Sequence, residues 1–263
     1  MPETRANRGP AAYLSFVGIG LLAGLLSGLF GVGGGTVIVP LLVLLLGFEQ
    51  RLAVGTSLAA IVPSAAVGVI SYAVAGRVAW IPALILAATA VIGAQIGTRL
   101  LARLSQTVLR WCFIGFIVVV IVSLFLVIPS RDAVLELTWL TGAALALLGM
   151  VTGIVAGLIG VGGGIVVVPA LMILFGTSDL EAKGTSLLMM IPTAISGTVN
   201  NLRNRNVDVR AAVLVGVAAC TTTALGAWLA TLLDPAAGNM LFAAYLVFIA
   251  VQMSIKTLRA RRR

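Results

Sequence analysis

The chain has 263 residues, of which 60% are hydrophobic and 10% are charged, and its mean hydropathy is +1.17. This composition excludes an ordinary soluble domain, because apolar runs long enough to cross a hydrocarbon layer of about 30 Å as helices recur from end to end. We therefore expect an all-α polytopic membrane protein. The net charge of +9 does not indicate a nucleic-acid partner, since the basic residues lie in short loops and at the tail, where they orient membrane helices.

The first half of the chain is predicted to begin with a retained membrane helix rather than a cleaved signal peptide. The apolar run at 11–29 leads directly into further membrane segments, without a convincing small-residue cleavage site. A glycine-rich turn at 31–35 and a short apolar helix at 36–46 follow. The remaining helices of this half are expected at 52–74, 80–101 and 109–128, ahead of a linker at 129–137.

The second half repeats the first with an offset of 129 residues. Residues 28–40 recur as 157–169 with the same glycines, and the Gly-Thr-Ser at 55–57 recurs at 184–186. We divide the chain into a first membrane repeat, 1–130, and a second, 131–263. The second repeat is expected to hold a glycine turn at 160–164 and helices at 138–159, 165–175, 184–202, 207–233 and 240–255.

The distribution of Lys and Arg predicts how the two repeats are oriented. If the N-terminus is cytoplasmic and each glycine hairpin enters and leaves on one side, all but three of the 17 basic residues fall on the cytoplasmic face. The exceptions are Arg77, Arg131 and Lys183. This asymmetry follows the positive-inside rule and makes both termini cytoplasmic and the repeats inverted. Each repeat then has a glycine-turn re-entrant hairpin plus about three spanning helices, an architecture that recurs among secondary transporters.

The two glycine turns are the candidate substrate site. The helix at 36–46 spans roughly 16 Å at 1.5 Å per residue, so it crosses only half of the membrane. In an inverted arrangement both half-helix N-termini aim at the midplane, where unpaired N–H groups and the positive end of the helix dipole favour an anion. The candidate substrate-binding residues are Gly31, Gly33, Gly34, Gly35, Thr36, Thr56, Ser57, Gly160, Gly162, Gly163, Gly164, Thr185 and Ser186.

The same residues also have purely structural interpretations. Glycines in membrane helices often serve close packing, and the Thr-Ser pairs could be N-caps. Lys183 is expected to be an interfacial charge that could also draw anions toward the site. A soluble phosphate loop is excluded by context, because no βαβ unit is present and no Lys-Ser/Thr follows the glycines.

Neither an enzyme nor a metal or cofactor site is expected. The chain has no His, and no acidic pair lies within a predicted membrane segment. Cys112 and Cys220 lie inside apolar segments without metal-ligand spacing, so they are interpreted as packing residues. All eight acidic residues are expected in loops or tails, whereas a cation carrier would be expected to hold Asp or Glu in the membrane.

The doubled Gly-Leu-Phe/Ile-Gly-Val-Gly-Gly-Gly, with its Val-x-Val-Pro and the later Gly-Thr-Ser, resembles the sulfite exporter TauE/SafE family of membrane transporters. The resemblance covers residues 13–258. It implies a multi-pass carrier in the inner membrane for small anions, often sulfur-containing ones such as sulfite, sulfoacetate or other organosulfonates.

The leading hypothesis is a secondary transporter of a small oxyanion, which is bound between the two glycine turns and moved by alternating access at a midplane site. The expected partners are the anion and the lipid bilayer, and the oligomeric state stays open. The alternatives are an anion channel built from the same parts and a non-transporting membrane subunit or assembly factor that uses its glycine-rich helices to dock a partner.

Overall fold

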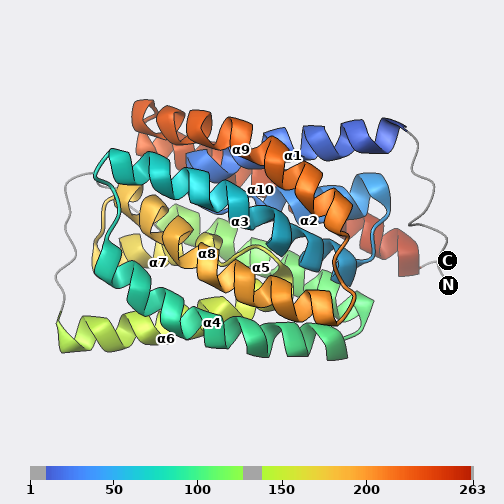
Figure 1. Ribbon diagram of the computed structural model, residues 1–263, viewed down its shortest axis with the longest axis horizontal. Helices are drawn as coiled ribbons and strands as arrows, with labels where there is room; N and C mark the ends of the chain where they lie inside the picture. The colour runs from blue at the N-terminus through green and yellow to red at the C-terminus, as the bar shows by residue number, and fades with distance from the viewer. Residues whose placement is uncertain (1–9, 127–137, 262–263) are drawn as a thin grey trace.

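The computed structural model describes residues 10–126 and 138–261, and within these ranges the chain forms ten α-helices (Figure 1). The helices of the first repeat are α1 (Pro10–Phe30), α2 (Gly35–Leu46), α3 (Gln50–Val74), α4 (Trp80–Arg103) and α5 (Gln106–Leu126). Those of the second repeat are α6 (Trp139–Ile159), α7 (Gly164–Phe175), α8 (Asp179–Arg203), α9 (Val209–Leu232) and α10 (Pro235–Arg261). The predicted linker at 129–137 lies outside the described residues.

The helix lengths confirm an all-α polytopic membrane protein. Among the described residues, five helices, α1, α3, α4, α6 and α9, are long and apolar enough to cross a membrane. In contrast, α2 and α7 have only 12 residues each, or roughly 18 Å at 1.5 Å per residue. Both short helices are bounded by left-handed glycines, Gly34 and Gly47 for α2 and Gly163 and Gly176 for α7.

Helix α8 begins earlier than the sequence predicts, at Asp179 rather than at residue 184. The side chain of Ser178 caps it by accepting the N–H of Glu181, and acidic residues in a first turn are favoured by the helix dipole. The expectation that all acidic residues lie in loops or tails was therefore wrong for Asp179 and Glu181. Hydropathy missed this turn because its charges mask the start of an otherwise apolar helix.

The main helix interfaces each join one helix of the first repeat to one of the second. Figure 1 shows α1 beside α9 along one edge of the molecule and α4 beside α6 along the opposite edge. In the first pair, a Cβ added to Gly24 would lie 2.1 Å from the carbonyl oxygen of Ala219. In the second, a Cβ on Gly153 would lie 2.1 Å from that of Ala90. These are equivalent contacts of the repeat, and backbones this close require residues without a side chain.

The repeat-equivalent helices α3 and α8 pack against each other at the centre. Gly68 of α3 faces Leu187, near the start of α8, whereas Leu58 faces Gly197, near its end. The two helices therefore run antiparallel. Their orientation relative to a membrane, and with it the inversion of the repeats, stays a prediction.

The close approach of α1 to α9 predicts that Gly24→Ala destabilises the fold. Adding one methyl group forces the helices apart, and overpacking of this kind costs about 1–3 kcal/mol. Gly18→Ala is the matched control on the same helix, because nothing lies within 4 Å of its added Cβ. Thermal unfolding in detergent should give a lower midpoint for Gly24→Ala alone, and equal midpoints would contradict the packing role.

Candidate functional site

The two glycine turns lie side by side in the buried centre. A Cβ on Gly35 would lie 2.7 Å from the carbonyl oxygen of Gly160, and a Cβ on Gly164 would lie 2.6 Å from that of Gly31. Residues 31–36 and 160–165 are all buried. The end of each turn therefore contacts the beginning of the other, and the structure brings together the two sets of glycines that the sequence singled out.

The turns adopt a conformation that only glycine accepts without strain. Gly33 and Gly34 have φ of 74° and 72°, and Gly162 and Gly163 have φ of 78° and 91°, in the left-handed region that other residues rarely visit. Helix α2 begins immediately afterwards, where the N–H groups of Val37 and Ile38 both donate to the Gly34 carbonyl at 2.9 Å.

The N-termini of α2 and α7 present backbone donors to the interior. Within the part of the chain that the structure describes, no acceptor is found for the N–H groups of Gly33, Gly34 and Gly35 or of their counterparts Gly162, Gly163 and Gly164. The first N–H groups of a helix have no partner inside it, and the helix dipole adds a partial positive charge there. Each of these helix N-termini lies against the opposite glycine turn, beside the carbonyl of Gly160 for α2 and of Gly31 for α7.

One serine hydroxyl from the opposite repeat holds each turn in place. Ser57 donates to the carbonyl of Gly160 at 2.8 Å, and Ser186 donates to the carbonyl of Gly31 at 2.6 Å. Both hydroxyls are fully buried. These predicted site residues therefore orient the turns in this structure through equivalent, reciprocal hydrogen bonds.

The neighbouring threonines hold the beginnings of other helices. Thr56 accepts the N–H of Asp208 at 3.0 Å, and Thr185 accepts the N–H of Ala79 at 3.0 Å. Asp208 and Ala79 are the N-cap residues of α9 and α4. The Thr-Ser pairs are not the N-caps of their own helices, because the N-cap positions of α3 and α8 are held by Glu49 and Ser178.

Two further hydroxyls lie close to the turns and were missed from the sequence. Ser27 and Thr152 are fully buried, and neither side-chain oxygen has a hydrogen-bond partner among the described residues. The Ser27 carbonyl accepts the N–H of Gly31 at 2.8 Å, and Cγ2 of Thr152 lies 2.6 Å from a Cβ built on Gly163. The sequence held a signal for both: the equivalent positions of the other repeat, 156 and 23, are alanine, so each hydroxyl is a departure from the repeat.

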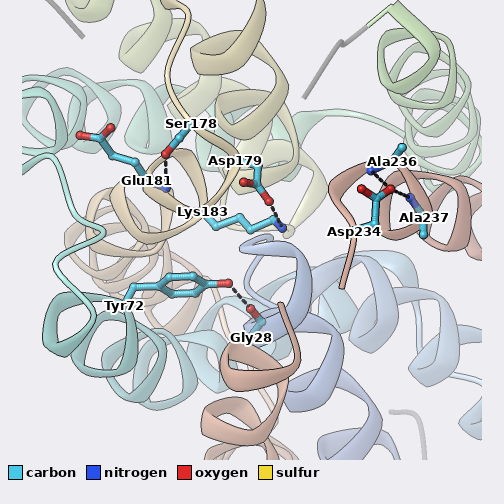
Figure 2. A network of polar contacts seen from close by, with 9 residues as sticks. All are labelled: Gly28, Tyr72, Ser178, Asp179, Glu181, Lys183, Asp234, Ala236 and Ala237. Carbon is cyan, nitrogen blue, oxygen red and sulfur yellow. Dashed lines mark hydrogen bonds and ion pairs between the residues drawn. The ribbon is translucent and has the colours of Figure 1, made fainter. Parts of the chain in front are cut away.

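A charged pair lies against the first turn (Figure 2). Lys183 Nζ is 3.2 Å from Asp179 Oδ2, and the two side chains are only 12% and 3% exposed. A Cβ on Gly31 would lie 2.6 Å from Cα of Lys183. The side chain of Lys183 is therefore largely buried beside the turn, and its position relative to the membrane interface stays a prediction. Its repeat equivalent is Val54, so only one turn has a charged pair at this position.

Tyr72 of α3 completes this side of the site. Its hydroxyl donates to the carbonyl of Gly28 at 2.7 Å, near the end of α1, as Figure 2 shows. Gly28 lies in the last turn of α1, so this bond holds the helix end next to the glycine turn. The described residues contain no group of three or more His, Cys, Asp or Glu that could hold a metal ion.

The chain is similar to known membrane proteins over most of its length. The family model for the sulfite exporter TauE/SafE matches residues 2–124 and 145–263. A "Probable membrane transporter protein" of Xylella fastidiosa (strain 9a5c) is 31% identical over 223 residues, covering 82% of this chain and 84% of that protein. Another with the same name, from strain Temecula1, is 29% identical and covers 89% and 92%. "Probable membrane transporter protein YdhB" of Bacillus subtilis is 27% identical and covers 71% and 78%.

The buried pair beside the first turn predicts a non-additive response to mutation. Lys183→Met leaves the Asp179 carboxylate buried without its cation, and breaking a buried pair in this way costs about 3–5 kcal/mol. Adding Asp179→Asn should restore most of the loss, because the site then holds no uncompensated charge. Thermal unfolding of the single and double variants checks this, and identical midpoints would show that the pair is solvated rather than buried.

Proposed function

The chain belongs to the sulfite exporter TauE/SafE family, and we propose that it is a secondary transporter of a small anion. One observation carries this proposal: two glycine turns, each opening a half-length helix, lie against each other in the buried centre. Paired helix N-termini are a suitable site for an anion because their N–H groups lack partners and their dipoles are positive.

The charges around the turns also favour an anion over a cation. Residues 27–36 and 156–165 contain no charged side chain, and the nearby Asp179 is paired with Lys183. A cation carrier would instead place carboxylates where they can replace the ion's water shell. Here the donors greatly outnumber the anionic groups.

The proposed substrate is a sulfur-containing oxyanion, either sulfite or an organosulfonate such as sulfoacetate. The family description names sulfite, and the relatives' names state membrane transport without a substrate. Sulfite and sulfonate groups each present three oxygen atoms on one face. Such a group can accept hydrogen bonds from both turns at once, as phosphate does at a helix N-terminus.

The proposed mechanism is alternating access by inverted repeats in the inner membrane, with both termini cytoplasmic. The antiparallel contact of α3 with its equivalent α8 supports it, as do the equivalent pairs α1 with α9 and α4 with α6. Rocking of one set of helices against the other would then expose the turns to each side in succession. The positive-inside distribution of Lys and Arg supports the orientation.

Flux measurements in proteoliposomes test the proposal. With radiolabelled sulfite, sulfate and sulfoacetate, we expect saturable uptake of at least one anion, accumulated against its gradient when a coupling gradient is supplied. Movement only down the gradient would instead favour an anion channel. Absence of flux for every anion would contradict the proposal and favour a non-transporting membrane subunit, which should then purify in a stoichiometric complex.

Variants of the turns connect the flux to the site. Gly34→Leu and Gly163→Leu force a branched side chain into the left-handed region and into α1 or α6. If the steric clash costs about 1.4 kcal/mol or more, anion affinity falls at least tenfold. We therefore expect the flux to fall by at least that factor. Gly47→Leu is the matched control, since Gly47 has a φ of 66° but nothing within 4 Å of its Cβ. Undiminished flux in folded Gly34 and Gly163 variants would make the turns packing devices.

A further inference from the structure

A single methionine side chain lies against both glycine turns. Met190 of α8 is fully buried, and its Cε lies 1.8 Å from a Cβ built on Gly33 and 2.3 Å from one built on Gly162. Its Sδ lies 2.8 Å from a Cβ built on Gly164. The thioether therefore occupies the space that the missing side chains of both turns leave at their point of contact.

The internal repeat makes this methionine distinctive. Its equivalent in the first repeat is Ile61, which also reaches the turns, with Cγ2 3.2 Å from a Cβ built on Gly33 and Cδ1 3.0 Å from one built on Gly35. Isoleucine is β-branched and stiff at χ1, whereas methionine is unbranched, with three rotatable bonds and a polarisable sulfur. Methionine therefore has more rotamers through which to leave the centre than isoleucine has.

The chemistry of the turns gives this movement a role. The N–H groups of Gly33, Gly34 and Gly35 and their counterparts have no acceptor among the described residues, and the atoms packed against them here include an apolar methyl group. The thioether fills the point where the two turns meet, so an oxyanion held between the turns needs this volume. Binding of the anion and the present position of Met190 therefore exclude each other.

We infer that Met190 is the residue that closes the anion site and limits the size of the anion, an inference that rests on the proposed function. In the closed state the methyl group seals the donors from water and from the opposite side of the membrane. In the bound state the side chain turns away and the anion takes its place. Specificity for small anions then depends on the volume that this one side chain releases.

Cysteine labelling tests whether position 190 lies on the anion's path. The Met190→Cys variant is made after Cys112→Ala and Cys220→Ala have removed the two native thiols. The probe is 2-sulfonatoethyl methanethiosulfonate, which itself carries a sulfonate. We expect labelling at least about tenfold faster than that by a trimethylammonium analogue, because the turns favour anions, and we expect sulfoacetate or sulfate to slow it.

Leu187→Cys in the same background is the control. Leu187 is fully buried on the same helix but packs against Gly68 rather than the turns, so its thiol should resist the reagent. Equal labelling at both positions, or labelling at 190 that no transported anion slows, would overturn the inference. A wild-type protein that transports none of the anions would instead overturn the proposed function, so the two failures are distinguishable.

A second variant covers the case in which the cysteine protein does not fold. Met190→Ala removes the competing group, and the apparent dissociation constant falls as the competent fraction rises, so binding should tighten about threefold or more. Sulfoacetate-dependent thermal stabilisation measures this by mass action. Leu187→Ala is the control, because it truncates a buried side chain of the same helix that packs against Gly68 and leaves the methionine in place. If Met190→Ala needs the same sulfoacetate concentration as the wild type for half-maximal stabilisation, the inference is overturned.

Discussion

The centre of this protein depends on a reciprocal pair of hydrogen bonds. Ser57 and Ser186 each donate, across the repeats, to a carbonyl at the start of the opposite glycine turn, at 2.8 and 2.6 Å. Inside a membrane, irregular backbone is tolerated only where protein buries it or where it lines a cavity, and each unsatisfied polar group is costly. These hydroxyls satisfy the turn carbonyls and leave the N–H groups as the remaining donors. In the proposed transporter, an anion would meet these donors next to two carbonyls that are already occupied.

The glycines serve two physically different purposes. Those along α1 and α6, such as Gly24 and Gly153, are needed because a carbonyl of the neighbouring helix stands where a Cβ would be. Those in the turns, such as Gly34 and Gly163, are needed for their left-handed φ as well. The first group sets how closely the repeats approach, and that distance brings the second group into contact. Helix packing and the candidate site are therefore consequences of the same spacing.

Much of the fold and the two glycine turns could be predicted from the sequence. Apolar composition alone does not explain a glycine run that recurs after 129 residues. The half-length helices α2 and α7 followed from it. The first turn of α8 did not, because Asp179, Glu181 and Lys183 depress the local hydropathy while tertiary contacts bury two of them. The position of Met190 could not be predicted either, since an apolar residue in an apolar helix gives no sign of facing two turns. Only the structure joins Gly33 and Gly162 to it.

The places where the repeats differ indicate how a carrier of the proposed kind would be biased. If the repeats were identical, exchanging their conformations would give two states of equal free energy, open to opposite sides. Three pairs of repeat-equivalent positions that adjoin the turns hold different residues. They are Lys183 and Val54, Met190 and Ile61, and Thr152 and Ala23. Each difference adds a free energy to one state that the other lacks, and a few kcal/mol are enough to leave the minor state at 0.1–10%. In the proposed transporter, the shared glycines would build the site, and the unshared side chains would decide which way it faces at rest.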